Sequence, residues 1–219
     1  MMTHRAVIPF RIENPKSRLS AVLSPDERVS LVQLMLKNTI SVLERSGISS
    51  VDILSVTPID LTFLSEECSS SLSLQVDDRD LNSALNDYLE KCAAPVLIIM
   101  ADLPLVTPDA VRRVCASPAD ICIAPGRGGG TNLLKIGRPD VFRVRYYGKS
   151  FVSHRREAAA CGLSFDVADS FFAGADLDEP DDIVEVLIHG HGPVFDYLSG
   201  LFDVDDTNAC LRARVAQKK

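Results

Sequence analysis

The chain has 219 residues, 46% of them hydrophobic and 24% charged, which is typical of one globular domain large enough to bury a substantial core. Its formal net charge of −7 argues against a dedicated nucleic-acid-binding protein. No apolar run approaches the ~20 residues of a membrane helix, and residues 1–5 lead into a short strand with no apolar core of a signal peptide. We therefore expect a cytoplasmic protein with neither a nucleic-acid nor a membrane partner.

In chain order, the first half predicts a strand at 5–10, a helix from 25 to about 45, strands at 51–56 and 72–76, a helix at 81–92 and a strand at 96–100. The second half predicts a helix at 108–115, a strand at 119–124, a glycine-rich loop at 125–132, a strand at 133–136, a helix at 148–160, a strand at 164–167 and a helix at 180–188. Such alternation predicts an α/β fold, a three-layer α/β/α sandwich with a mostly parallel sheet. We expect a single domain at 1–205 and a polar C-terminal tail at 206–219.

The cysteines and histidines do not form a recognisable metal site. The six cysteines lack CxxC pairing and are expected to be reduced thiols buried in apolar patterns: Cys68, Cys92, Cys115, Cys122, Cys161 and Cys210. His189 and His191 lie where a helix ends at glycines, and this structural interpretation is favoured over metal binding. His154 lies on an amphipathic helix, where we expect a substrate contact or a helix-surface role.

The strand at 96–100 is the most informative segment. It is a continuous apolar run, typical of a strand buried on both faces, and it is followed by Asp102. Open α/β sheets bind their ligands at the carboxyl ends of their strands. Magnesium takes few protein carboxylates and completes its coordination with substrate phosphates. Asp102 is therefore either a turn residue or a magnesium ligand.

Three other loops are expected at the same edge of the sheet. The loop after the first strand contains Lys16, Ser17 and Arg18, which suit a phosphate chain, although a solvated basic loop would look the same. It has neither the GxxxxGK[ST] nor the GxGxxG pattern. The glycine-rich loop at 125–132 ends in Thr131 and Asn132, and is either an anion-binding loop or a flexible connection.

The fourth loop, at 176–182, is acidic. Asp181 and Asp182 are explained by an ordinary helix N-terminus, where acidic side chains complement the helix dipole. Asp176 and Asp178 precede the helix and could face the same cleft as Asp102. These two residues are therefore candidates for a second metal carboxylate.

Six segments in order resemble one enzyme family. They are Ala6–Phe10, Lys16–Ser20, Leu81–Leu85, Met100–Pro104, Gly129–Asn132 and Asp176–Asp178. Together they resemble the 2-phospho-L-lactate guanylyltransferase (CofC) family of coenzyme F420 biosynthesis, which is related to the phosphoenolpyruvate-using enzyme FbiD. Each motif is weak alone, and the ordered set is specific.

The resemblance implies transfer of GMP from GTP to 2-phospho-L-lactate, giving lactyl-2-diphospho-5′-guanosine and pyrophosphate, on a Rossmann-like nucleotidyltransferase sheet of the GT-A-like type. It implies Lys16, Arg18 and Asp102 as catalytic residues, and Asp102 and Asp178 as ligands of Mg²⁺. The remaining implied contacts with nucleotide are Pro9, Ser17 and Asn82, and those with the acceptor are Thr131, Asn132, Gly148 and Ser150. A homodimer is also expected for the family.

The sequence departs from the family at two places. Asp80 stands where members usually have glycine before the helix that starts at residue 81, and the turn at 147–150 is one residue shorter. Three alternatives remain. The acceptor could be phosphoenolpyruvate or 3-phosphoglycerate, the protein could be another nucleotidyltransferase with the same sheet, or it could be a non-catalytic nucleotide-binding module. The rival molybdenum-cofactor and sugar-phosphate nucleotidylyltransferases usually carry a glycine-rich signature after the first strand, which this chain lacks.

Overall fold

The computed structural model describes residues 5–64, 69–205 and 214–217. Within these residues, one seven-stranded sheet has the order β3-β2-β1-β4-β6-β5-β7, and β8 and β9 form a separate pair. The strands are β1 Arg5–Phe10, β2 Ser50–Ser55, β3 Ser71–Val76, β4 Val96–Ile99, β5 Ile121–Pro125, β6 Thr131–Ile136, β7 Phe165–Val167, β8 Phe202–Asp205 and β9 Arg214–Gln217. In the larger sheet β6 pairs antiparallel with both neighbours, and the other pairings are parallel. The predicted α/β fold with a mostly parallel sheet is confirmed.

The described helices are α1 Pro25–Arg45, α2 Leu81–Glu90, α3 Pro108–Ala116, α4 Ser150–Ala160, α5 Phe171–Gly174, α6 Pro180–His189 and α7 Pro193–Leu201, with 3-10 turns η1 Ser17–Ala21, η2 Thr62–Leu64 and η3 Arg127–Gly129. Helices α1, α2 and α3 begin after residues whose side chains cap them, Ser24, Asp80 and Thr107. Before α1, the side chain of Ser24 accepts a hydrogen bond from the Glu27 backbone N–H and the Glu27 carboxylate accepts one from the Ser24 N–H. This reciprocal capping box explains why the helix begins at Pro25.

The sheet is buried on both faces. Ile8 and Leu97 share one core with α1, α3, α6 and α7, whereas Val7 and Ile98 share the other with α2 and α4. Side chains alternate between the faces of a strand, so a strand covered on both sides must be apolar throughout. This burial accounts for the unbroken apolar run in β4, at the centre of the sheet.

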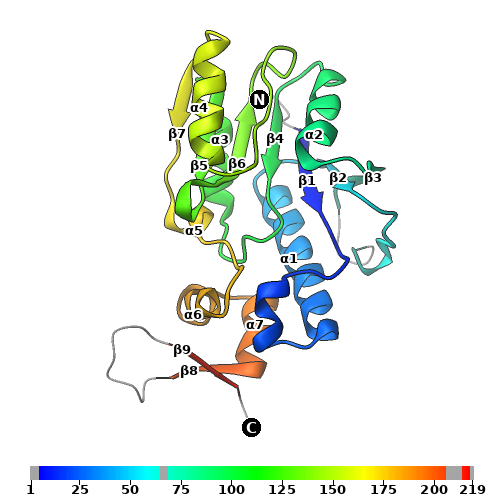
Figure 1. Ribbon diagram of the computed structural model, residues 1–219, viewed down its shortest axis with the longest axis vertical. Helices are drawn as coiled ribbons and strands as arrows, with labels where there is room; N and C mark the ends of the chain where they lie inside the picture. The colour runs from blue at the N-terminus through cyan, green and yellow to red at the C-terminus, as the bar shows by residue number, and fades with distance from the viewer. Residues whose placement is uncertain (1–4, 65–68, 206–213, 218–219) are drawn as a thin grey trace.

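The C-terminal part contains elements that the sequence pattern did not predict. Figure 1 shows α6, α7 and the β8–β9 pair grouped at the lower end of the molecule. Arg214–Gln217, in the segment expected to be a polar tail, forms β9 and pairs antiparallel with β8. A four-residue strand has too little periodicity to identify it, and its pairing partner fixes its conformation. Residues 206–213 lie outside the described part of the chain.

The described cysteines agree with the expectation of reduced thiols. Cys92, Cys115, Cys122 and Cys161 are free, although Cys122 alone among these four is fully buried. Cys68 and Cys210 lie outside the described residues. In the described part of the chain, none of the helices has the length and hydropathy that crossing a bilayer requires.

Tyr88 supports a buried carboxylate between α2 and β2. Its hydroxyl donates a 2.6 Å hydrogen bond to Asp52 Oδ2, and Asp52 is only 4% exposed. Replacing Tyr88 by Phe is expected to lower the free energy of unfolding by about 1–3 kcal/mol, because Asp52 then loses a donor inside the protein. Urea unfolding measures this loss. As a control, Tyr147→Phe removes a hydroxyl from a side chain that is mostly exposed, and we expect a change within about 0.5 kcal/mol; equal losses in the two variants contradict this explanation.

Candidate active site

The loops after β1 and β4 leave the sheet side by side. These strands are adjacent and parallel, with Ala6 aligned with Leu97, so their carboxyl ends lie at one edge of the sheet. Lys16 follows β1 and Asp102 follows β4. The topology therefore brings together two of the residues that the sequence predicted for the site.

The ammonium of Lys16 lies between two carboxylates. Its Nζ donates to Asp102 Oδ2 at 2.9 Å and to Asp178 Oδ1 at 2.6 Å. Burial alone would lower the pKa of Lys16, but the charges of Asp102 and Asp178 outweigh it and raise this pKa above its ordinary value. Lys16 is therefore charged at neutral pH, and it compensates the charges of both carboxylates.

Backbone contacts place the acidic loop beside β4. The Leu177 N–H donates to the Asp102 carbonyl at 3.0 Å. The Asp182 carboxylate accepts from the backbone N–H of Asp178 at 2.9 Å and of Glu179 at 2.8 Å. Asp182 thus caps α6, as the sequence indicated, while Asp178 is directed to Lys16. Asp176 lies nearby: its burial, followed by the charges of neighbouring carboxylates that include Asp102 and Asp178, raises its pKa above the ordinary value.

Arg28 of α1 holds the cationic loop. Its Nη1 donates to the Pro15 carbonyl at 2.8 Å and to Asn14 Oδ1 at 3.2 Å, and the residue is 6% exposed. Asn14 and Lys16 have φ values of 42° and 49°, a left-handed conformation that is strained for non-glycine residues and persists where the surroundings enforce it. The sequence pattern did not single out Arg28, because a cation in an amphipathic helix usually belongs to the exposed face.

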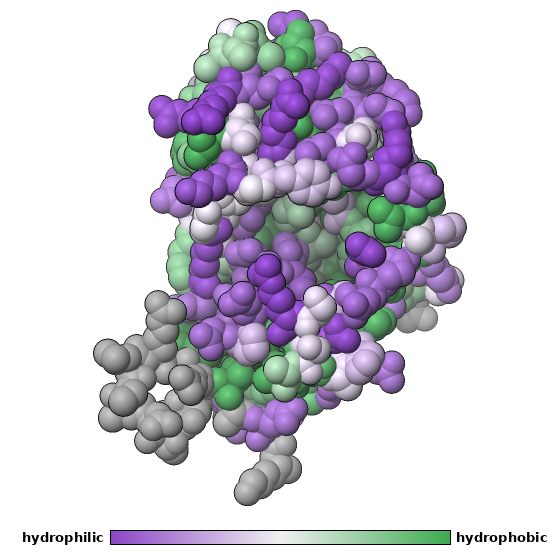
Figure 2. Space-filling view, in the orientation of Figure 1, coloured by the Kyte–Doolittle hydropathy of each residue, from purple (hydrophilic) through white to green (hydrophobic). Residues whose placement is uncertain are grey.

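A cavity of about 490 Å³ lies at this edge of the sheet, within the usual size range of small-molecule sites. Of the predicted residues, it is lined by Pro9, Lys16, Ser17, Arg18, Asp102 and Asp178. Phe10, Met35 and Met100 add apolar walls that the sequence did not single out. Figure 2 shows a hollow near the middle of the face drawn, with hydrophilic residues around much of it.

The donor set of this cavity fits a magnesium ion. Asp102 and Asp178 offer carboxylate oxygens, and both already lie within 3 Å of one positive group, the Lys16 ammonium. No cluster of three or more protein ligands occurs among the described residues. Magnesium commonly uses one or two carboxylates together with water and substrate phosphates, so two aspartates are sufficient.

A second cluster joins the start of β6 to the start of α4. Ser150 Oγ donates to Thr131 Oγ1 at 3.1 Å, and Thr131 Oγ1 lies 3.1 Å from His154 Nδ1. All three residues are buried. The Met100 N–H donates to the carbonyl of Asn132, the residue after Thr131, so this cluster lies beside the end of β4. The expectation of a surface role for His154 is wrong: its imidazole is fully buried, and burial lowers its pKa to about 4.

The other two predicted acceptor contacts, Asn132 and Gly148, do not contribute side chains to the cluster of Thr131, Ser150 and His154. The Asn132 side chain lies on the opposite face of β6 and donates to the Ala173 carbonyl at 2.9 Å. A Cβ at Gly126 would lie 2.4 Å from its Oδ1, so glycine is needed there. Gly148 is exposed and has a φ of 68°, which a side chain would strain.

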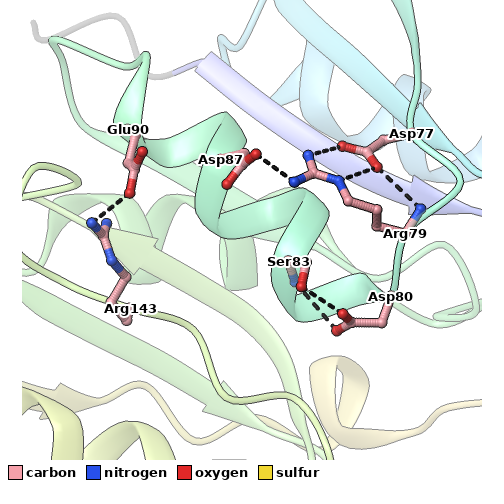
Figure 3. Close-up of polar contacts among 7 residues, drawn as sticks. All are labelled: Asp77, Arg79, Asp80, Ser83, Asp87, Glu90 and Arg143. Carbon is pink, nitrogen blue, oxygen red and sulfur yellow. Dashed lines mark hydrogen bonds and ion pairs between the residues drawn. The ribbon is translucent and has the colours of Figure 1, made fainter.

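The start of α2 explains one departure from the family pattern. Asp80 is the N-cap residue, with φ −63° and ψ 156°, and its carboxylate accepts from the backbone of Asn82 and Ser83. This conformation needs no glycine. Figure 3 shows the Asp80–Ser83 contact at the first turn of α2 and the Arg79 guanidinium between Asp77 and Asp87.

Asn82 supports the loop before α4. Its Oδ1 accepts from the Tyr146 N–H at 2.7 Å, and the residue is not among those that line the 490 Å³ cavity. The structure therefore does not bring Asn82 together with Lys16 and Asp102. Its predicted contact with the nucleotide stays a prediction.

Sequence comparisons relate this chain to a family of known proteins. Residues 4–218 match the family described as "Guanylyl transferase CofC like". The 2-phospho-L-lactate guanylyltransferase of Methanosarcina barkeri is 47% identical over 201 residues, covering 92% of this chain and 94% of that protein. The enzyme of the same name from Methanocella arvoryzae is 43% identical over 215 residues, covering 98% and 93%.

Solved structures with low sequence identity share the fold. A protein from Desulfovibrio desulfuricans G20, described as a nucleotide-diphospho-sugar transferase, has a TM-score of 0.69 at 18% identity, covering 91% of this chain and 95% of that one. A cytidylyltransferase from Leptospira borgpetersenii has a TM-score of 0.55 at 12% identity, covering 91% and 93%. The likeness to these structures shows the fold alone, whereas the match over nearly the whole sequence shows the family: this chain belongs to the CofC-like guanylyl transferases.

Proposed function

We propose that this enzyme transfers GMP from GTP to 2-phospho-L-lactate, forming lactyl-2-diphospho-5′-guanosine and pyrophosphate, in coenzyme F420 biosynthesis. The observation that carries the proposal is the Lys16–Asp102–Asp178 cluster at the edge of a cavity of about 490 Å³. Lys16 and Asp102 at the carboxyl ends of adjacent strands, with Asp178 from the loop before α6, suit a nucleoside triphosphate and its metal. The relatives of 41–47% identity carry the name of this activity.

The chemistry requires charge neutralisation more than acid–base catalysis. An oxygen of the acceptor phosphate attacks the α-phosphorus of GTP, a new P–O bond forms, and the bond to the β-phosphate oxygen breaks as pyrophosphate leaves. The attacking phosphate is already ionised at neutral pH, so it needs no general base. Magnesium, held by Asp102 and Asp178, would supply positive charge to the triphosphate.

Within the chain, Lys16 and Arg18 would bind the triphosphate. Lys16 is paired with both aspartates, and phosphate oxygens would offer its ammonium further acceptors while the two carboxylates would hold the metal. Arg18 is 69% exposed and lies 3.4 Å from Glu179. Because this exposed pair is weak, Arg18 is available to phosphate.

The acceptor would bind at the Thr131–Ser150 cluster. It joins the start of β6 to the start of α4, and the start of β6 lies beside the end of β4, the strand that Asp102 follows. Lys149, in the exposed turn before α4, adds positive charge nearby. Since the Asn132 amide is already bonded to Ala173, we propose Thr131 and Ser150 as the side-chain contacts and Gly148 as a backbone contact.

Pyrophosphate release with the purified protein and Mg²⁺ tests the proposal. GTP with 2-phospho-L-lactate is expected to give the fastest release among the four ribonucleoside triphosphates paired with this acceptor, phosphoenolpyruvate or 3-phosphoglycerate. Faster turnover of another acceptor would replace the substrate and keep the reaction class. GTP binding without pyrophosphate release from any acceptor would contradict catalysis and favour a nucleotide-binding module.

The homodimer, the cytoplasmic location and the absence of nucleic-acid and membrane partners stay predictions from the sequence. Sedimentation of the purified protein would measure its oligomeric state.

A further inference from the structure

His154 makes two buried hydrogen bonds that link the elements of the acceptor site. It is 0% exposed and lies one turn after Ser150 in α4. Its Nε2 accepts from the Arg145 N–H at 2.8 Å, and its Nδ1 lies 3.1 Å from Thr131 Oγ1. The ring packs against Tyr146, with centroids 5.0 Å apart, and against Phe142 at 5.9 Å. One imidazole thus joins β6, α4 and the loop before α4.

These contacts define which nitrogen carries the proton. A backbone N–H can only donate, so Nε2 must be the unprotonated nitrogen of the ring. Neutral imidazole then carries its hydrogen on Nδ1, which donates to Thr131. Burial lowers the pKa of His154 to about 4, and the ring therefore stays neutral at neutral pH.

This tautomer determines the role of the Thr131 hydroxyl. Thr131 Oγ1 accepts from His154 Nδ1–H and from the Ser150 hydroxyl, and these two bonds use its acceptor capacity. Its own hydrogen remains as a donor. A phosphorylated carboxylate is rich in acceptor oxygens and, when fully ionised, has no donor on its anionic groups, so a hydroxyl restricted to donating is complementary to it.

An exposed turn adjoins this buried cluster. Gly148 and Lys149 are exposed in the turn that begins α4. A Cβ at Gly129 would lie 3.9 Å from the Lys149 side chain, so the glycine-rich loop flanks the same turn. Small residues and a cation therefore lie on the exposed side of the turn that adjoins Ser150, the hydrogen-bond partner of Thr131.

We propose that His154 is a positioning residue that makes Thr131 a hydrogen-bond donor to the anionic acceptor substrate. It acts through Thr131 and transfers no proton. The inference rests on the proposed function of the same site, because it requires the acceptor to bind beside Thr131.

Two matched variants separate the contacts of the ring. His154→Asn keeps an N–H near the position of Nδ1 and loses the acceptor for Arg145. His154→Gln keeps an acceptor near Nε2 and loses the donor to Thr131. Removing one uncharged hydrogen bond is expected to raise the KM for 2-phospho-L-lactate about fivefold to tenfold in His154→Gln, with the KM for GTP within about twofold of the parent. In His154→Asn, which keeps the donor to Thr131, the KM for the acceptor should lie closer to the parental value than in His154→Gln.

The outcomes distinguish this inference from the proposed function. A parent protein that releases no pyrophosphate with any acceptor contradicts the proposed function. If the parent is active and both variants change the KM for the acceptor and the KM for GTP equally, His154 has only a structural role. That result overturns the inference. Nitrogen NMR of the labelled parent tests the tautomer without activity or substitution: an unprotonated Nε2 at neutral pH is expected, and an Nε2–H signal for His154 overturns the proposal even if the variants do not fold.

Discussion

Replacing Asp102 by asparagine is expected to reduce kcat for pyrophosphate release by about 100-fold or more, the usual cost of removing one electrostatic contact to developing charge. Asparagine has nearly the shape of aspartate and lacks its charge, so the change removes a metal ligand with little effect on packing. Asp102 is partly exposed, with 25% of its side chain accessible. Lys16 keeps Asp178 as a partner, and the thermal unfolding midpoint should therefore stay close to that of the parent. Steady-state kinetics and circular dichroism measure the two effects.

Asp109→Asn is the matched control. Asp109 lies on α3 with 84% of its side chain exposed, where it pairs with Arg112, and its loss should leave kcat unchanged. Calorimetric titration with Mn²⁺ provides a second measurement, in which Asp102→Asn should bind the ion more weakly than the control variant. A folded Asp102→Asn protein that turns over near the parental rate would remove Asp102 from the site.

Replacing Lys16 by methionine is expected to lower kcat/KM for GTP by about 100-fold, because a cation that stabilises the transferring phosphoryl group is lost. Methionine preserves much of the apolar stem of lysine in a side chain that is only 12% exposed. The pKa of Lys16 is raised by its two carboxylate partners, so the parent keeps this charge across the neutral and mildly alkaline range. The effect of the substitution should therefore be the same from pH 6 to pH 9.

Lys91→Met removes an exposed lysine at the end of α2 and should leave GTP kinetics unchanged. Arg18→Ala should have a smaller effect than Lys16→Met, since Arg18 is 69% exposed and makes one long ion pair. Parental GTP kinetics in both Lys16→Met and Arg18→Ala would exclude the loop after β1 from triphosphate binding.

Local sequence signals predicted many of the helices and strands. The predicted helices at 25–45 and 108–115 begin where α1 and α3 begin, after the capping residues Ser24 and Thr107, and the apolar runs located β1, β4 and β5. Caps and buried strands are encoded in a few neighbouring residues. Strand direction was not encoded in this way. The apolar pattern of a strand buried on both faces is the same in either direction, so β6 is recognised as antiparallel only from its pairing with β4 and β5.

In the candidate site too, some residues could be predicted from local sequence signals and others could not. Lys16, Asp102 and Asp178 could be predicted because each follows or precedes an element whose end the sequence marks, and parallel strands bring their ends to one edge. The structural roles of Asn82 and Asn132 could not be predicted in this way. Their amides are bonded to Tyr146 and Ala173, respectively, and nothing near them in the sequence identifies these partners.

The sequence by itself determined the family, the α/β fold and the strand ends that carry charge. Only the tertiary structure decided that one ammonium joins Asp102 to Asp178, that Arg28 holds the loop of Lys16, and that His154 is a buried link between Thr131 and Arg145. The physical reason is that burial and hydrogen bonds depend on residues far apart in the sequence, such as Lys16 and Asp178, which are separated by 162 positions. The same histidine on an amphipathic helix can be exposed or buried, and the elements packed against it decide which.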